Sequence, residues 1–356
     1  MNLADFDYHL PEELIAQEPL ADRAASRMLV VHRAEGRWED RRFRDLPDCL
    51  GPGDCLVLND SRVFPARLFG RRAGVHALPI GKHNARRQEY LSGAVEVLLV
   101  RPLDDAAREW LALVHPGRKM KVGERVRFSA GLECEVTGRG TFGERHLRFH
   151  SEAADIYEEF EKIGHVPLPP YIRRADVPAD RERYQTVFAR ERGSAAAPTA
   201  GLHFTGEVLD AVRARGAEIA RVTLHVGLGT FQPIHAERIE EHRMHSESFH
   251  IAAEDAARMR AARRLVAAGT TSMRTIETAA RRGGIAEMRG DTDIFIYPGF
   301  EFRAAGALLT NFHLPRTSLL LLVAAFAGTE LTLAAYRHAV EERYRFFSYG
   351  DCMLVL

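Results

Sequence analysis

Short strand-like segments recur evenly between residues 67 and 151, and this stretch constrains the possible folds more than any other part of the chain. The segments are separated by turns that contain glycine or proline, and they show no helical periodicity. They cover residues 95–100, 110–114, 125–128, 134–136 and 146–149. Short strands spaced roughly ten residues apart are typical of a small β-barrel or sandwich. We therefore predict an inserted small β-barrel domain at 67–151.

The chain on either side of this insertion alternates between helical and strand-like patterns. Helical patterns occur at 153–163, 206–216 and 252–267, and strand-like stretches at 217–224, 264–268, 294–297 and 307–310. Such alternation indicates a layered α/β domain with a mostly parallel sheet and flanking helices. We predict that residues 1–66 and 152–356 form this α/β domain.

Charge and cysteine usage narrow the class of protein. The 356 residues include 49 Lys plus Arg and 49 Asp plus Glu, which argues against a general polycation but not against a local basic surface. The four cysteines include no CxxC pair and suit a reducing compartment. The N-terminus lacks the features of a secretory signal, and the longest apolar run, 319–327, is far shorter than the roughly 20 residues that span a bilayer. We expect a cytoplasmic protein with no membrane partner.

Two basic stretches stand out against this balanced charge. Residues 61–88 contain seven Lys or Arg and no acidic residue, and 116–121 form a second basic turn. These stretches are either solvated loops or a surface that follows phosphates. The proline-rich segment 164–174 is either a rigid connector or a ledge that faces RNA. The candidate RNA contacts are Arg62, Arg67, Lys119, Arg173, Arg174, Arg183 and Arg345.

Polar residues follow several of the predicted strands, where α/β proteins place their sites. Residues 59–62 follow the apolar strand at 55–58, and Gly227 and Gly229 follow another without completing a GxGxxG fingerprint. In the segment 269–275, between a strand and a helix, Gly269 is followed directly by three hydroxyl residues. This layout is either an ordinary turn or a seat for an anion.

Three further segments combine histidine with polar or aromatic residues. His203 precedes a helix for which we predict Thr205 as the N-cap. Residues 242–247 hold two histidines and Glu247, but not at the spacing of a zinc-binding helix, so we expect no metal. The aromatic and apolar segment 343–356 predicts a docked strand that holds Arg345, Tyr349 and Asp351 near the core.

The chain resembles, essentially from end to end, the S-adenosylmethionine:tRNA ribosyltransferase-isomerases of queuosine biosynthesis (the QueA family). The resemblance rests on long blocks in the same order, among them FDYHLPEELIAQEP, GDCLVLNDSRVFPARLFGR, IGHVPLPPYIRR, APTAGLHFT, VTLHVGLGTFQP, HRMHSE, GTTSMRT, TNFHLPRTSLL and ERYRFFSYGDCML. Two departures lie outside these blocks: the stretch 73–92 is longer than usual, and 258–265 is a few residues shorter. The contacts of the enlarged loop 73–92 are therefore left open.

The resemblance implies both an architecture and a reaction. The architecture is an α/β catalytic domain with an inserted β-barrel. The ribosyl carbons of S-adenosylmethionine move to the aminomethyl group of 7-aminomethyl-7-deazaguanine at the wobble position of tRNA. They rearrange to give epoxyqueuosine, while adenine and methionine leave. S-adenosylmethionine is a consumed co-substrate, no other cofactor is implied, and we expect a monomer that binds tRNA.

Matching this chemistry to residue types yields the candidate site. Proton transfer near neutral pH favours histidine or a tuned carboxylate, so the catalytic candidates are His203, His225, His313, Asp60 and Glu247. The donor's anionic and hydroxyl groups need fixed polar partners. The candidates for binding S-adenosylmethionine are Gly227, Gly229, Thr230, Thr271, Ser272, Arg274, Asn311, Tyr349 and Asp351.

Two other functions remain open at this point. A non-catalytic RNA-binding module would explain the basic stretches but would leave the polar strand ends unused. A metal-dependent hydrolase is the weaker alternative, because the histidine spacing does not match a metal site.

Overall fold

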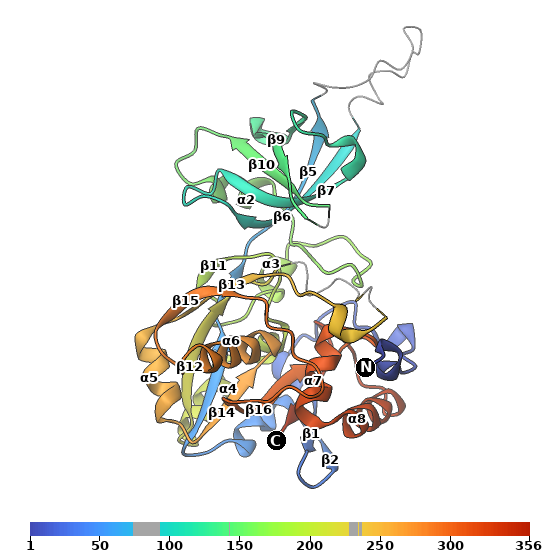
Figure 1. Cartoon of the computed structure of the whole chain (residues 1–356), viewed down its shortest axis with the longest axis vertical. Coiled ribbons are helices and arrows are strands. Elements are labelled where there is room, and N and C mark those ends of the chain that lie inside the picture. Colours follow the sequence, from blue (N-terminus) through green and yellow to red (C-terminus); the bar gives the residue numbers. More distant parts are fainter. Residues whose placement is uncertain (74–92, 142, 228–233, 235–236) are drawn as a thin grey trace.

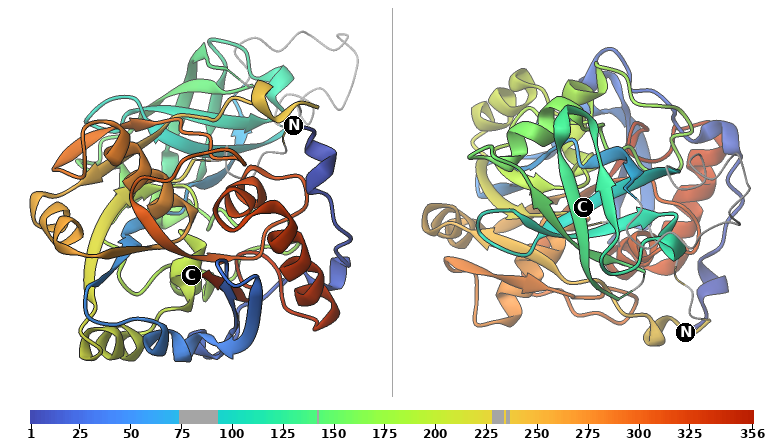
Figure 2. Two further views of the ribbon diagram at one scale, coloured as in Figure 1. Left: turned by 60° about the horizontal axis from the view of Figure 1, so that its bottom comes forward. Right: turned by 90° about the horizontal axis from the view of Figure 1, so that it is seen from above.

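The computed structural model describes the chain except for residues 74–92, 142, 228–233 and 235–236. Figure 1 shows a larger layered domain that contains both chain ends and a smaller barrel that stands above it. Seen from above in Figure 2, the barrel is stacked over the larger domain. The chain leaves the larger domain after β4 (Ser61–Val63) and returns after α2 (Ile156–Ile163). The predicted class, a layered α/β domain with an inserted β-barrel, is confirmed.

One nine-stranded sheet forms the centre of the larger domain. In spatial order its strands are β15 (Met288–Thr292), β13 (Glu247–Ile251), β12 (Glu218–Leu224), β3 (Asp54–Asn59), β14 (Arg264–Ala268), β16 (Ala305–Asn311), β17 (Cys352–Val355), β1 (Arg27–His32) and β2 (Arg37–Arg42). The central run β12–β3–β14–β16 is parallel, as the sequence pattern predicts.

The flanks of the sheet differ from its centre. Strands β13 and β15 on one side, and the pairs β16–β17 and β1–β2 on the other, are antiparallel, while β17 and β1 pair in parallel. The sheet is therefore mixed, with its longest parallel run at the centre. Connections as short as residues 33–36, between β1 and β2, permit only antiparallel pairing.

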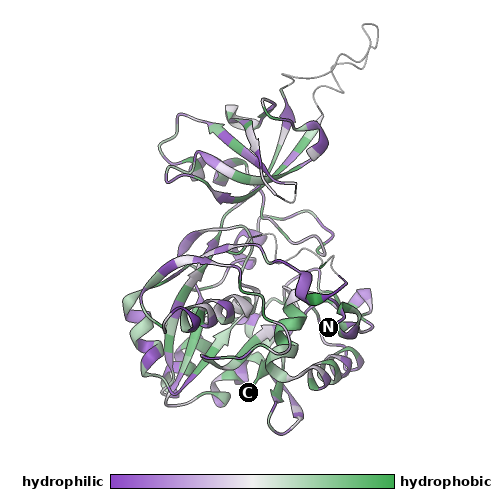
Figure 3. Ribbon diagram, viewed as in Figure 1, coloured by the Kyte–Doolittle hydropathy of each residue, from purple (hydrophilic) through white to green (hydrophobic). Residues whose placement is uncertain are grey.

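Helices cover both faces of the central strands, which explains why these strands are continuously apolar. In β3, Cys55 and Val57 pack on one face and Leu56 and Leu58 on the other, because successive side chains alternate. The first face packs against α5 (Ala253–Ala261), α6 (Thr270–Arg281), α7 (Ser318–Ala327) and α8 (Thr329–Glu341), and the second against α4 (Gly206–Ala214) and the short helix η4 (Phe43–Cys49). Figure 3 shows the apolar central strands and α7 inside the domain.

The inserted unit is a closed antiparallel barrel of six strands. In spatial order they are β10 (Arg145–His150), β7 (Glu109–His115), β6 (Ala94–Pro102), β5 (Arg67–Arg72), β8 (Arg125–Arg127) and β9 (Glu133–Arg139). Helix α2 closes its core, where the rings of Phe160 and Trp110 lie 5.6 Å apart. Because α2 packs on the barrel, the compact unit continues past residue 151.

Three local predictions can be compared with the structure. Thr205 is the N-cap of α4, and its Oγ1 accepts a hydrogen bond of 3.3 Å from the Val208 N–H. The C-terminal segment is docked as β17 between β16 and β1. The prediction of a strand at 294–297 is wrong: this segment is irregular. Its apolar residues pack against the helix-covered face of the sheet instead of joining a neighbouring strand.

Among the described residues, no single helix is long and apolar enough to cross a membrane. The pair α7 and α8 meets the length and composition requirement only when both helices are counted together across their 116° bend.

Candidate active site

One cavity of the larger domain, which we name the main cavity because the ends of central strands meet at it, lies at the edge where the parallel strands β14 and β16 end. The backbone N–H of Gly269, just after β14, donates a hydrogen bond of 2.7 Å to Leu309 O of β16, so the residues that follow these strands lie side by side. Polar, apolar and aromatic side chains share the lining: Tyr171, Ala197, Pro198, Thr199, Ala200, Val226, Gly269, Thr270, Thr271, Thr310, Asn311, His313, Leu319, Phe347 and Ser348. Such strand ends are where open α/β sheets bind ligands.

Helix α6 begins at this cavity, immediately after β14. Its N-cap Gly269 has φ +93°, a conformation that a side chain would strain. The free N–H groups and dipole of a helix N-terminus favour an anion. Thr270 and Thr271 face the cavity, whereas Ser272 is fully buried and its hydroxyl donates to Ala268 O at 2.9 Å. Of the two hydroxyl residues predicted here to bind S-adenosylmethionine, Thr271 lines the cavity and Ser272 does not.

The amide of Asn59 joins the ends of three elements beneath the cavity. Its Nδ2 donates to Leu224 O at 3.0 Å and to Thr271 Oγ1 at 3.2 Å. Its Oδ1 accepts from the N–H groups of Ser61 and Leu224 at 3.1 and 3.0 Å. The amide of Asn59 thereby fixes the ends of β3 and β12 against the first turn of α6. The sequence placed this residue in a polar turn but did not reveal its partners.

Glu247 and Arg274, both predicted site residues, pair with each other. Arg274 Nη1 is bonded to Glu247 Oε2, and both side chains are 4% exposed. Glu247 Oε1 also accepts a hydrogen bond of 2.9 Å from the N–H of Gly227, and Arg274 Nε donates to Ile294 O at 3.3 Å. The pair ties α6, β13 and the segment after β12 together. Neither residue is among those that line the main cavity.

The three candidate histidines lie in different places. His313 lines the main cavity and contacts Thr310 Oγ1 through Nε2 at 2.8 Å. His203 does not line the main cavity but lines a second cavity. His225 lines neither of these cavities, and its ring faces Gly193, where an added Cβ would lie 3.0 Å from Cε1.

Burial determines the charge of these histidines. It lowers the pKa of His313 to about 3. Burial, reinforced by the neighbouring guanidinium groups of Arg23 and Arg345, lowers the pKa of His203 to about 3. Burial also lowers the pKa of His225. All three imidazoles are therefore neutral at pH 7.

The second cavity adjoins the first, and it contains two arginines that form no ion pair with any described residue. Ser348 lines both cavities. Arg23 donates to the carbonyl oxygens of Gln185, Leu202 and Glu182 at 2.9, 3.1 and 2.8 Å. Arg183 donates to those of Leu20 and Ala21. The lining residues are Pro19, Leu20, Arg23, Ser26, Arg183, Leu202, His203, Ser348, Tyr349 and Gly350. The sequence patterns did not single out Arg23.

The candidate carboxylates outside the Glu247 pair accept hydrogen bonds within the fold. Asp60 Oδ1 accepts from the Thr223 hydroxyl at 2.7 Å. Asp351 accepts from the backbone N–H groups of Arg27 and Arg345, each at 2.8 Å. Burial raises the pKa of both carboxyl groups. Asp60 and Asp351 line neither cavity.

The predicted RNA-contacting residues differ in how much of their charge is already paired. Arg174 forms two bonds with Asp180, of 2.6 and 2.8 Å, and Arg173 pairs with Glu12. Asp180 also accepts from the Tyr349 hydroxyl at 2.9 Å. These contacts hold the 164–184 segment in place, as a structural connector would be held.

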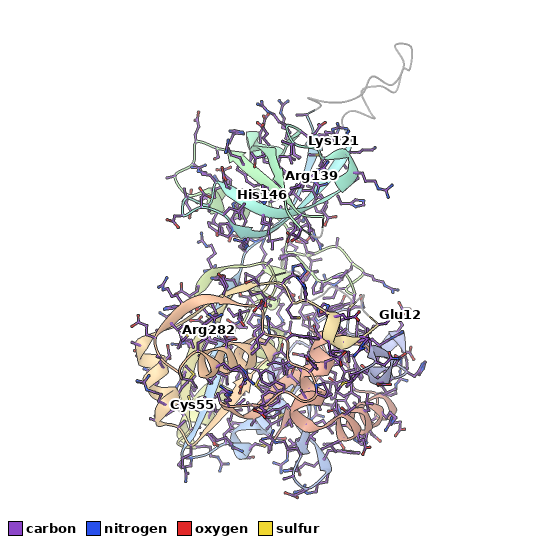
Figure 4. All side chains as sticks on the ribbon, viewed as in Figure 1. Glu12, Cys55, Lys121, Arg139, His146 and Arg282 are labelled. Atoms are coloured by element: carbon purple, nitrogen blue, oxygen red, sulfur yellow. The ribbon has the colours of Figure 1, made fainter. Side chains whose placement is uncertain are left out.

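The other candidate cations lie near the barrel or the second cavity. Arg67 joins the barrel to the connector through Leu168 O at 3.0 Å and contacts Glu96 at 3.1 Å. Arg62 and Lys119 are exposed. Arg345 donates to Glu18 O, and its buried Nη1 has no hydrogen-bond partner within the described ranges. Figure 4 shows Lys121 and Arg139 on the barrel and Glu12 on the larger domain.

Some predicted residues fall outside the description. Gly229 and Thr230, as well as the enlarged loop apart from Ala73, lie outside the described residues. Within the described ranges, no group of three or more His, Cys, Asp or Glu side chains could hold a metal ion.

Among the cavity residues that the sequence patterns missed, two aromatic ones stand next to each other. The rings of Tyr171 and Phe347 lie 4.0 Å apart and form one wall of the main cavity. Phe347 has φ +72°, which is unusual for a bulky residue and is found at functional sites. Its aromatic neighbourhood in the sequence is equally consistent with an ordinary core position, so no local signal distinguishes it.

Comparisons with known proteins agree along the whole chain. The family model described as "Queuosine biosynthesis protein" matches residues 3–355. An S-adenosylmethionine:tRNA ribosyltransferase-isomerase of Solibacter usitatus is 68% identical over 356 residues, with 100% of both chains covered. One of Symbiobacterium thermophilum is 53% identical over 363 residues, with the same coverage. The crystal structure of an S-adenosylmethionine tRNA ribosyltransferase from Thermotoga maritima is similar with a TM-score of 0.54 and 40% identity, covering 99% of this chain and 100% of that one.

Proposed function

Because this chain belongs to the queuosine biosynthesis protein family, we propose that its main cavity is where S-adenosylmethionine is bound during ribosyl transfer to tRNA. The family's enzymes are S-adenosylmethionine:tRNA ribosyltransferase-isomerases, and this chain has the same activity in queuosine tRNA modification. In the detailed reaction that we propose, the ribosyl carbons pass to 7-aminomethyl-7-deazaguanine at the wobble position. Rearrangement gives epoxyqueuosine, and adenine and methionine leave.

The observation that carries the placement is the convergence of three features on one cavity. The N-terminus of α6, with Thr270 and Thr271, suits the methionine carboxylate. The aromatic wall of Tyr171 and Phe347 suits the sulfonium or the adenine ring, since π faces attract cations and stack on bases. A neutral histidine, His313, stands in the same lining.

We assign proton transfer to His313, because it is the one candidate histidine that lines this cavity. The sulfonium makes the neighbouring C5′ hydrogens acidic, so a nearby acceptor with a free lone pair is required. Burial keeps the imidazole neutral at pH 7, although the lowered pKa also makes it a weaker base. The remaining predicted residues would not contact the substrate in this cavity. Glu247 and Arg274 would hold α6 and β13 together as an ion pair, and Asp60 and His225 would support the segments they pack against.

We propose that tRNA lies across the barrel and the second cavity. Arg183 and Arg345 support this proposal best, because their guanidinium groups are bonded to carbonyl oxygens and retain their charge. Arg62 and Lys119 extend the basic surface toward the barrel. Arg67, Arg173 and Arg174 would contribute less, since carboxylates already pair with them. We place this reaction in the cytoplasm and expect a monomer, which light scattering of the purified protein would test.

Turnover with both substrates tests the proposed site. Wild-type protein is incubated with S-adenosylmethionine and tRNA that carries the 7-aminomethyl-7-deazaguanine precursor, and the release of adenine is measured. Thr271→Val keeps the shape of the side chain but removes its hydroxyl, and we expect it to raise KM for S-adenosylmethionine. The matched control is Thr329→Val at the start of α8, away from both cavities. An unchanged KM for Thr271→Val would contradict the placement, and a protein that binds tRNA without releasing adenine would favour the RNA-binding alternative.

A further inference from the structure

The neighbours of Asn311, the last residue of β16, determine which way its side-chain amide faces. It is 2% exposed, and its Nδ2 contacts His203 Nε2 at 3.1 Å, Phe347 O at 3.1 Å and Asp351 O at 3.4 Å. Two of these atoms are carbonyl oxygens, which accept hydrogen bonds and cannot donate them. Only the amide nitrogen can face them, so the amide oxygen points to the other side.

Asn311 lines the main cavity, and its amide oxygen is an unused acceptor. Within the described ranges, Oδ1 is buried and has no hydrogen-bond partner. Buried acceptors are nearly always paired, so an unpaired one calls for a specific explanation. A hydrogen-bond donor of a bound molecule would satisfy this oxygen.

His203 holds the Asn311 amide in place and has no free polar atom of its own. Its Nε2 accepts from the Asn311 amide, so the ring proton must be on Nδ1, which lies 2.9 Å from Ser26 Oγ. The Ser26 hydroxyl in turn donates to Arg23 O at 3.2 Å. The ring also packs against Phe43, with centroids 5.2 Å apart. The His203 imidazole is therefore bonded on both sides before any ligand arrives.

Asn311 also lies next to the proposed seat for a carboxylate. Ala268 and Leu309 are register partners in the parallel pair β14–β16, and the chain continues from them to the first turn of α6 and to Asn311. In a free α-amino acid group, the carboxylate and the ammonium are attached to the same carbon. A carboxylate at the α6 N-terminus would therefore bring the ammonium group toward the neighbouring strand end.

We propose that Asn311 Oδ1 accepts a hydrogen bond from the α-ammonium group of the methionine moiety of S-adenosylmethionine, and that His203 is a positioning residue that orients the Asn311 amide. This inference rests on the proposed function, because it requires S-adenosylmethionine in the main cavity. It assigns His203 no proton transfer.

The first experiment measures binding by calorimetry to S-adenosylmethionine and to two analogues. One analogue lacks the α-ammonium group, and the other carries an oxo group in place of the adenine amine. Wild type should bind the first analogue about tenfold more weakly than S-adenosylmethionine, as expected for a lost charge-assisted hydrogen bond. Asn311→Ala should lose this discrimination. If the alanine variant does not fold, the same measurement is made on Asn311→Ser.

The outcomes of this experiment are distinct. An Asn311 variant that still discriminates against the first analogue as wild type does would overturn the proposal. The proposal would also be overturned if the Asn311 variant lost discrimination only against the oxo analogue. That result would assign the contact to the adenine amine. A wild type that binds none of the three compounds would instead refute the proposed function.

The second experiment separates positioning from proton transfer at His203. His203→Gln retains an acceptor for the Asn311 amide, and His203→Phe does not. We expect His203→Gln to keep kcat and the wild-type pH profile, while His203→Phe raises KM about tenfold with a smaller change in kcat. If His203 moves protons, both variants should lose kcat by roughly 10²–10⁴-fold and the pH profile should lose one limb, which would overturn the proposal. His338→Gln, on α8 and outside both cavities, is the control.

Discussion

Arg274 on α6 and Glu247 on β13 form a buried ion pair, with each side chain 4% exposed, and Glu247 also accepts from the N–H of Gly227. Breaking such a pair leaves an uncompensated charge in the interior. We expect Glu247→Gln and Arg274→Gln each to lower the free energy of unfolding by about 3–5 kcal/mol, measured by chemical denaturation. In the double variant the losses should be far from additive. A variant that unfolds like wild type but has lost turnover would show that the pair contacts substrate instead.

The conformation of Gly269 at the start of α6 provides a second prediction. Gly269 and Gly328 have φ +93° and +91°, and neither has an atom within 3.4 Å of an added Cβ. Alanine should therefore strain the backbone similarly at both positions, by about 1–3 kcal/mol, as measured by thermal unfolding. Gly269 lines the main cavity and Gly328 does not. Only Gly269→Ala should raise KM for S-adenosylmethionine, and an equal KM for both variants would argue against a ligand at α6.

The buried histidines predict how stability depends on pH. The pKa of His203 falls from its usual value near 6.5 to about 3 in the folded protein, so between these values the unfolded chain binds more protons. The stabilisation is complete above pH 6.5 and is lost as the pH falls toward 3, by up to about 1.4 kcal/mol per pH unit. His203→Gln should flatten the pH dependence of the unfolding free energy in this window. An unchanged slope would show that His203 does not stay neutral in the fold.

Burial of Asp60 and Asp351 acts in the opposite direction. Their pKa values are raised in the folded protein, so the folded chain holds protons that the unfolded chain releases. Their contribution is present at low pH and is lost as the pH rises through the folded pKa. Asp60→Asn should therefore make the unfolding free energy fall more steeply as the solution is acidified. Urea denaturation at a series of pH values measures both effects on the same scale.

The arginines of the second cavity predict a change in salt dependence. If Arg183 contacts a phosphate of tRNA, Arg183→Gln should weaken binding and reduce the slope of log Kd against log salt by about 0.7–0.9. The control is Arg213→Gln on α4, whose guanidinium is exposed and paired with Asp210 at 2.7 Å. Fluorescence titrations of tRNA at several salt concentrations provide the slopes. Equal slopes for the two variants would exclude Arg183 from the RNA surface.

The sequence predicted the parts of this protein that depend on local pattern. Even strand spacing identified the barrel, and the alternation of helices and strands identified the α/β domain. The glycine after β14 indicated that a helix follows, but α6 begins at Thr270 and includes the hydroxyl residues that the pattern placed before the helix. These features follow from periodicity and from the geometry of helix ends, which short stretches of sequence encode.

The arrangement of the site could not be predicted, because it depends on which strands are neighbours. Glu247 and Arg274 each suit a ligand site by residue type, but 27 positions separate them and only the fold shows that they pair with each other. His203, His225 and His313 are all near strand ends, yet only His313 lines the main cavity. Phe347 was overlooked because its signal is a backbone angle, which residue identity does not reveal.

The place of β17 between β16 and β1 has a consequence for the order in which the protein folds. β1 is made early, but its partner strand is made last: Arg27 and Asp351, whose groups are bonded at 2.8 Å, are 324 positions apart. At about 5–20 residues per second on a ribosome, β1 waits tens of seconds for β17. During that time the barrel, whose strands are contiguous in sequence, can close on its own, while β1 keeps an unpaired apolar edge. The nascent chain should therefore expose this edge to chaperones or to other chains until its last strand emerges.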